Sequence, residues 1–195
     1  MLKYEDLAKQ ERDEYLEIII RESGRLSALA TNVLNLSKVE SQTILTGQEA
    51  YDLTEQVRRC ILLLEPQWEE KKLDLSVELE DLQYYGNQDM LSQVWLNLID
   101  NAIKFSPKNS TIDISLKQDD SAIKFTIADS GVGIDAETLP HIYDKFYQGD
   151  SSHATIGNGL GLAVTQRIVS LHGGDIDCQS RPDLGTVFIV SLPVR

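Results

Sequence analysis

The N-terminal segment carries apolar residues at helical spacing. Between about Tyr4 and Glu40 it has no proline and only one glycine, and it is rich in Glu, Leu, Ala, Arg and Ile, as helices are. A helix of about 35 residues would be ~50 Å long, so we expect it to need a partner helix. The alternative is one helix packed back on its own domain. Spacings of four and three residues, typical of a coiled-coil seam, connect Tyr15, Ile19, Glu22, Leu26, Leu29, Val33 and Leu36.

After a hinge predicted at residues 42–48, helical and strand periodicities follow each other without regular alternation. This order favours an α+β fold over a doubly wound parallel sheet. A loop-rich stretch covers residues 129–158. The pattern predicts helices over Leu53–Trp68, Met90–Phe105 and Leu160–Leu171, and strands over Leu73–Leu79, Leu82–Tyr85, Thr111–Lys117, Ala122–Ala128, Asp175–Ser180 and Gly185–Leu192.

Composition and charge narrow the classes of partner. The formal net charge of −13 argues against nucleic acid and against an anionic membrane surface, because both require a basic face. Cys60 and Cys178 match neither a disulfide framework nor a zinc site, so we expect both to be reduced. No stretch approaches the ~18 apolar residues needed to cross a bilayer, and we expect a soluble chain. A membrane-spanning part of a longer parent protein would lie outside this sequence.

Glycines gather in the C-terminal third of the chain. Nine of the twelve follow residue 130, which suits a backbone that approaches a bound nucleotide closely. The run Gly157–Gly161 leads directly into a predicted helix, whose first amides and dipole can bind an anion. Alone, this glycine pattern is explained equally well by a structural loop.

The predicted helix Met90–Phe105 bears a polar stripe on a different face from its core residues. A solvated surface is the ordinary explanation, but two asparagines are unexpected because Asn is a poor helix former. An amide oxygen can ligate Mg²⁺, and an ammonium group can meet a phosphate. The stripe has spacings of four, four and three residues and consists of Gln93, Asn97, Asn101 and Lys104.

Five segments together resemble the motifs of sensor histidine kinases, whose catalytic domain belongs to a superfamily shared with gyrase and mismatch-repair ATPases. They occur in the expected order. Gln93–Ser106 resembles the asparagine box, Asp129-x-Gly131-x-Gly133 the first glycine box, Ile142–Tyr147 the phenylalanine box, Gly157–Leu162 the second glycine box, and Gly185-Thr186 the final glycine element.

The resemblance implies a fold and a set of roles. The fold is a two-layer α/β sandwich with a mixed sheet, preceded by the long helix, with ATP bound under a lid at about residues 147–158. Asn101 would ligate Mg²⁺, with Asn97 and Lys104 as catalytic residues near the phosphates. Asp129 would accept a hydrogen bond from the adenine amino group. The remaining implied ATP-binding residues are Phe105, Gly131, Gly133, Phe146, Gly157, Gly159, Leu160, Gly161, Leu162 and Thr186.

The same resemblance implies the organisation of the parent protein. Residues 1–41 resemble the second helix of the dimerisation hairpin, and residues 49–195 the catalytic domain. The acceptor box, roughly His-Glu-Leu-Arg-Thr-Pro, does not occur here. We therefore expect the γ-phosphate to pass to a histidine outside this chain, for relay to a response regulator. The parent would be a homodimer, with this part on the cytoplasmic side of the bacterial membrane. Lys145 and Gln148 stand where the family commonly has arginines, which puts transfer efficiency in question.

Three other functions compete. Related ATPases place a glutamate general base where this chain has Asn97, so hydrolysis should be slow. A serine-directed kinase of the same superfamily is disfavoured by the long N-terminal helix. A non-enzymatic nucleotide-sensing scaffold is supported by Gln148 and by the missing acceptor box.

Overall fold

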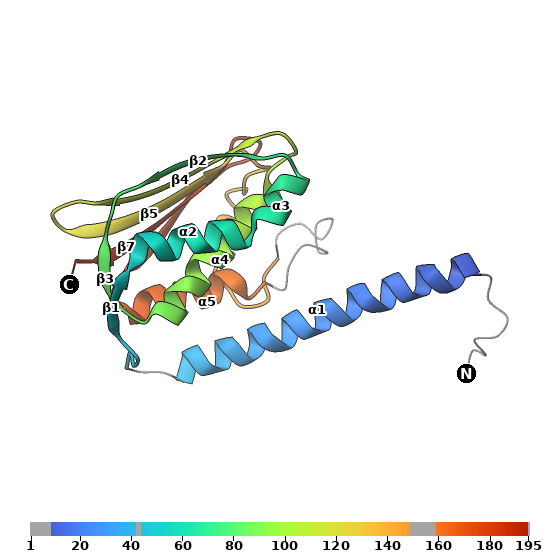
Figure 1. Cartoon of the computed structure of the whole chain (residues 1–195), viewed down its shortest axis with the longest axis horizontal. Coiled ribbons are helices and arrows are strands. Elements are labelled where there is room, and N and C mark those ends of the chain that lie inside the picture. Colours follow the sequence, from blue (N-terminus) through green and yellow to red (C-terminus); the bar gives the residue numbers. More distant parts are fainter. Residues whose placement is uncertain (1–8, 42–43, 149–158, 195) are drawn as a thin grey trace.

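A long helix precedes an α/β sandwich in the computed structural model, which describes residues 9–41, 44–148 and 159–194. Helices cover one face of a five-stranded sheet (Figure 1). The elements are α1 (Lys9–Ser41), β1 (Glu49–Asp52), α2 (Leu53–Leu63), α3 (Glu65–Glu70), β2 (Asp74–Leu79), β3 (Gln83–Gly86), α4 (Gln88–Phe105), β4 (Thr111–Gln118), β5 (Ala122–Asp129), a short 3₁₀ helix (Leu139–His141), α5 (Gly161–Leu171), β6 (Asp175–Arg181) and β7 (Gly185–Pro193).

The sheet is mixed. Its order is β2-β4-β5-β7-β6, with β2 and β4 parallel and the other pairs antiparallel. Alternate residues of the central strands are buried towards the helices, including Ile112 and Ile114 on β4 and Phe125 and Ile127 on β5. Period-two burial is what a sheet covered on one face requires. The predicted α+β sandwich is therefore confirmed.

Two differences from the predicted elements have local causes. The helix expected over Leu53–Trp68 is broken into α2 and α3 at Leu64. Pro66 lies in the first turn of α3, and in one continuous helix its ring would clash with the carbonyl of Leu62. Strand β1 was not predicted. It is short and pairs only with β3, in a separate two-stranded sheet.

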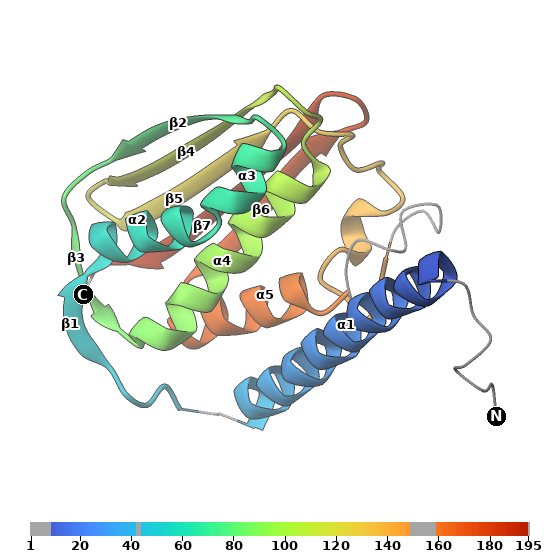
Figure 2. The same cartoon turned by 45° about the vertical axis from the view of Figure 1, so that its right-hand side comes forward.

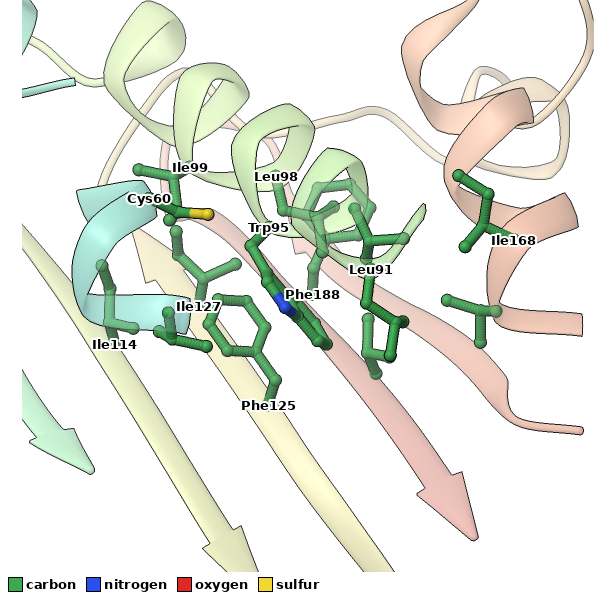
Figure 3. Close-up of a cluster of buried hydrophobic side chains, with 14 of the residues drawn as sticks. Cys60, Leu91, Trp95, Leu98, Ile99, Ile114, Phe125, Ile127, Ile168 and Phe188 are labelled. Carbon is green, nitrogen blue, oxygen red and sulfur yellow. The ribbon is translucent and has the colours of Figure 1, made fainter. Parts of the chain in front are cut away.

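Trp95 of α4 is the centre of the core between helices and sheet (Figure 3). Its indole is fully buried with its ring centroid 4.7 Å from that of Phe125, and its Nε1–H donates to Gln56 Oε1 over 3.0 Å. Cys60 packs in the same cluster, and both cysteines are free thiols, as expected. Burial raises the pKa of Cys60 and of Cys178. The core thus fixes α4 on the sheet.

Helix α1 contacts the sandwich mainly through its C-terminal end (Figure 1). Leu36, a residue of the predicted seam, is only 7% exposed and lies near α5, whereas Leu26 of the same seam is 65% exposed. The packing of α1 on α5 leaves a hollow of about 390 Å³ that Leu36 and Arg167 help to line. Among the described side chains of α1, burial against the sandwich occurs in the last turns, at Leu36 and Val39. Apolar side chains nearer the N-terminus of α1, including Tyr15 and Ile19, are exposed.

Among the described helices, none combines the length and the apolar character needed to span a bilayer. Residues 44–48, the described part of the predicted hinge, form neither helix nor strand. The division into residues 1–41, 42–48 and 49–195 stays a prediction.

Candidate functional site

Helix α4 lies beside α5 (Figure 2), and the residues of the predicted polar stripe on α4 are half-buried. Asn97 Nδ2 donates to the carbonyl oxygen of Gly161 over 3.1 Å and lies 3.3 Å from Thr165 Oγ1. Both bonds use the amide nitrogen, so the amide oxygen is the atom with which Asn97 could ligate a cation. Asn97 thus joins the asparagine-box helix to the first turn of α5.

Asn101 and Lys104 lie one and two turns further along the same side of α4. Both are half-buried. The Lys104 ammonium forms an ion pair with Asp100, one turn earlier in the helix. To bind a phosphate, as the sequence predicts, Lys104 would have to exchange this carboxylate for the ligand.

The C-terminal end of α4 is held by Lys71, which sequence reasoning missed. Its ammonium donates to the carbonyl oxygens of Ile103 at 2.8 Å, Lys104 at 2.7 Å and Ser106 at 3.0 Å. A cation at a helix C-terminus satisfies unpaired carbonyls and compensates the helix dipole. No local pattern signals this contact, because Lys71 lies more than 30 residues before its partners.

Replacing Lys71 with methionine should destabilise the fold by about 2 kcal/mol, since three charge-assisted hydrogen bonds to the helix end are lost. Urea unfolding followed by circular dichroism measures this change. Lys108→Met is the matched control, because Lys108 is an exposed lysine beyond the same helix end. It should change the unfolding free energy by less than about 0.5 kcal/mol. Equal losses in the two variants would show that net charge, not the three bonds, matters.

Asp129, the last residue of β5, has a carboxylate oriented by a backbone group. Its Oδ1 accepts from Gly131 N–H over 2.8 Å. Thr186 is its cross-strand neighbour on β7. Burial raises the pKa of Asp129, and the nearby backbone N–H groups of Gly131 and Thr186 oppose this. A partly desolvated acceptor in a fixed direction is suited to reading one donor on a ligand.

The glycines around Asp129 allow close backbone packing. A Cβ on Gly131 would lie 2.5 Å from the carbonyl oxygen of Phe105, which ties this loop to the end of α4. Gly133 and Gly185 have φ values of +69° and +86°, and a Cβ on either would lie 1.9 Å from a carbonyl oxygen. Glycine is therefore required at these positions because two backbone segments of this chain come close together there. The sequence pattern alone did not give this reason.

Ser180 of β6 orients the hydroxyl of Thr186 and was also missed. Ser180 Oγ donates to the carbonyl oxygen of Gly185 over 2.9 Å, accepts from Ile134 N–H over 2.8 Å and lies 2.9 Å from Thr186 Oγ1. Because Ser180 has one hydroxyl hydrogen, Thr186 must donate in their shared bond. The Thr186 hydroxyl oxygen is thereby left as an acceptor.

The residues on either side of the predicted lid, Phe146 and Gly159, are in contact. Phe146 N–H donates to the carbonyl oxygen of Gly159 over 2.8 Å, and both residues have positive φ values. A Cβ on Gly159 would lie 2.7 Å from the Phe146 carbonyl carbon. The Phe146 side chain is 62% exposed. Gly157 and the rest of residues 149–158 lie outside the described residues.

The predicted site residues form two groups connected by α4. Asn97, Gly161, the half-buried Leu162 and the fully buried Leu160 lie at the start of α5. Asp129, Thr186, Gly131 and the exposed Phe105 lie at the other end, where the loop after β5 packs on α4. Asn101 and Lys104 occupy the helix between them.

Comparison with known proteins places the chain among related sequences. Residues 86–195 match the family described as histidine kinase-, DNA gyrase B-, and HSP90-like ATPase. The heme sensor protein HssS of Staphylococcus haemolyticus is 36% identical over 183 residues, which cover 94% of this chain and 40% of HssS. Drug sensory protein A of Synechocystis is 36% identical, with 97% of this chain and 30% of that protein covered. The chain thus spans less than half the length of these relatives.

The fold of this chain is also similar to solved structures of histidine kinases. Full-length ShkA in complex with AMPPNP matches with a TM-score of 0.80 and 26% identity over 96% of this chain and 40% of that chain. Histidine kinase ThkA in complex with the response regulator protein TrrA matches with a TM-score of 0.75 and 26% identity over 100% of this chain and 53% of that chain. The family match covers more than half of the sequence and includes every predicted site residue. The chain therefore belongs to the family of histidine kinase-, DNA gyrase B-, and HSP90-like ATPases.

Proposed function

We propose that this ATP-binding domain is the catalytic part of a sensor histidine kinase and transfers the γ-phosphate of Mg·ATP to a histidine on a separate helix. The observation that carries the proposal is the half-buried Asp129 carboxylate, held by the Gly131 backbone N–H at one end of α4. An adenine amino group offers the donor that such an acceptor needs. Thr186, Gly131, Gly133 and Phe105 would surround the base.

The phosphates would lie along α4 towards α5. Asn101 would hold Mg²⁺ through its amide oxygen, and Lys104 would meet a phosphate oxygen after leaving Asp100. In the described part of the chain no cluster of three His, Cys, Asp or Glu side chains could hold a metal alone. Mg²⁺ usually binds with few protein ligands plus nucleotide phosphates, so a single amide donor fits. The bound ion would neutralise charge that develops on the transferred group.

Phosphoryl transfer would depend on positioning. The bond between the γ-phosphorus and its bridging oxygen breaks, ADP leaves, and a phosphorus–nitrogen bond forms on the acceptor histidine. Asn97 cannot take a proton from water as a carboxylate could, which favours transfer to histidine over hydrolysis. The backbone of Gly159, Leu160, Gly161 and Leu162 would contact phosphate at the start of α5. Phe146 would anchor the lid, whose predicted range includes Gly157.

Helix α1 supports a dimeric parent protein. Its exposed apolar residues include Tyr15, Ile19, Leu26 and Val33 of the predicted seam. A second helix would bury them, and we propose that residues 1–41 form half of a dimerisation hairpin.

ThkA was solved in complex with a response regulator, and we propose the same class of partner here. The relatives are named sensor proteins, which supports a cytoplasmic position in a membrane-anchored parent.

The proposal is tested by phosphotransfer in trans. The chain, Mg²⁺ and labelled ATP are mixed with a separate helical hairpin that bears the acceptor box. Acid-labile, base-stable label on the histidine is expected. Rapid phosphate release without acceptor would favour an ATPase, label on a serine would favour a serine kinase, and tight ATP binding without transfer would favour the scaffold.

Asn101→Ala should reduce Mg·ATP affinity at least tenfold, because one metal ligand is lost, worth about 1.4 kcal/mol. Titration calorimetry with and without Mg²⁺ measures this. Gln93→Ala is the matched control, because Gln93 is half-buried on the same stripe, two turns earlier. It should bind like the unaltered chain. An Asn101→Ala variant with equal loss in the absence of Mg²⁺ would contradict the metal assignment.

A further inference from the structure

Asn87 is a junction of three segments. It precedes α4, and its Oδ1 accepts from Met90 N–H over 2.9 Å as the helix N-cap. Its Nδ2 donates to the carbonyl oxygen of Thr46, in the segment between α1 and β1, over 2.7 Å. Its backbone N–H donates to His172 Nε2 over 3.1 Å. One residue therefore contacts the segment after α1, the start of α4 and the end of α5.

His172 is held in one tautomer by these contacts. It caps the C-terminus of α5 and is fully buried. Its Nδ1 lies 2.8 Å from the carbonyl oxygen of Ile168, which can only accept, so Nδ1 carries the hydrogen. Nε2 accepts from Asn87 and is therefore unprotonated. Tyr84 lies beside the imidazole, with ring centroids 6.3 Å apart, and a Cβ on Gly86 would lie 3.1 Å from His172 Cδ2.

Helices α4 and α5 are thus joined at two places. Asn97 bonds to Gly161 at the start of α5, and Asn87 bonds to His172 at its end. The helices are antiparallel, since the start of each lies near the later part of the other. At 1.5 Å per residue, the two connections are about 15 Å apart. One lies in the proposed phosphate site and the other lies outside it.

We propose that Asn87 and His172 are positioning residues for the nucleotide site: they set the register of α5 against α4 and fasten this helix pair to the segment that follows α1. The inference rests on the proposed function, because its effect is on how Asn97 and the first turn of α5 meet the phosphates. A change at His172 therefore alters ATP affinity without touching the ligand.

Two amide substitutions separate the two bonds of His172. A glutamine amide reaches about as far as Nε2 and can still accept from Asn87, whereas an asparagine amide reaches about as far as Nδ1 and keeps only the bond to Ile168. We expect His172→Gln to bind Mg·ATP within about twofold of the unaltered chain. His172→Asn should bind at least fivefold more weakly. Equal affinities, with only the melting temperature lowered in both, would show a merely structural role and overturn the proposal.

A double-mutant cycle tests transmission through the helix pair. The effect of His172→Asn on ATP affinity should largely disappear in an Asn97→Ala background, because the second connection is already lost. Additive effects would overturn the inference. If the unaltered chain does not bind Mg·ATP, the proposed function fails. The same double-mutant cycle measured by urea unfolding then tests, independently of ATP, whether the two connections between α4 and α5 are coupled. Coupled helices give non-additive unfolding free energies.

Asn87→Ser isolates the connection to the segment after α1. Serine retains the N-cap and the backbone N–H to His172 but cannot reach Thr46. Amide hydrogen exchange in residues 44–48 should become faster, while ATP affinity stays within about twofold. Unchanged exchange would remove the segment after α1 from the proposal.

Discussion

Replacing Asp129 with asparagine is expected to lower ATP affinity about 100-fold, close to 2.7 kcal/mol. The asparagine oxygen can still accept from Gly131 N–H, so the loop is kept. Its NH₂ group then replaces a carboxylate oxygen and faces the adenine amino group, donor against donor. Calorimetric titration with ATP and GTP measures both sides of this change, because guanine has an acceptor oxygen at the equivalent position. The ratio of the affinity for ATP to the affinity for GTP should therefore decrease.

The same substitution should stabilise the fold at neutral pH. Burial raises the pKa of Asp129, so the folded chain holds the proton more tightly than the unfolded chain. The stability contributed by the protonated carboxyl is present at low pH and is lost as pH rises through the raised pKa. Asparagine carries no charge to desolvate. We therefore compare the unfolding free energies of the Asp129→Asn variant and the unaltered chain. Their difference, variant minus unaltered, should increase as the pH rises from the usual pKa of a carboxyl group through the raised pKa of Asp129.

These two expectations separate a binding defect from a folding defect. An Asp129→Asn chain that is less stable and loses affinity for all nucleotides equally would show that Asp129 is structural. Asp135 provides a matched control. It is an exposed aspartate whose pKa is lowered by hydrogen bonds from Thr138. Asp135→Asn should leave ATP affinity unchanged and should not stabilise the chain.

Gly185→Ala is expected to cost about 3 kcal/mol of stability and to weaken ATP binding. Gly185 has φ +86°, and a Cβ there would lie 1.9 Å from the carbonyl oxygen of Asp129. The left-handed backbone conformation costs an alanine about 1–2 kcal/mol, and its Cβ would also push β5 and β7 apart. Since Asp129 lies on the displaced strand, its carboxylate moves with it. Urea unfolding and ATP titration measure the two losses.

Gly161→Ala is the control within the same set of motifs. A Cβ on Gly161 meets Asn97 only at 3.7 Å, an ordinary contact, in a right-handed helix. Its stability should stay within about 0.5 kcal/mol or improve, because alanine favours a helix. If Gly161→Ala destabilised the chain as much as Gly185→Ala, the close approach at Gly185 would not be the cause.

Periodicity predicted most of the fold because each element buries one face. The helix Met90–Phe105 and the strand pair Thr111–Lys117 and Ala122–Ala128 were predicted to within two residues at each boundary. Strand β1 was missed because four residues in a two-stranded sheet leave too little pattern to detect. The break at Leu64 was missed although Pro66 signals it, because the apolar spacing continues across the break.

The sequence by itself determined the family, the order of the elements and which residues are candidates for ATP binding. These features depend on residue types at short spacings along the chain, so they can be recognised without knowing the tertiary structure. Only the tertiary structure decided what holds those candidates: Lys71 on the end of α4, Ser180 on Thr186, and His172 on Asn87. Two of these contacts join residues at least 32 positions apart, and the third depends on strand register, so no local pattern contains them. The glycines show the same division: their positions are visible in sequence, but the carbonyl oxygens that exclude a side chain are placed there by folding.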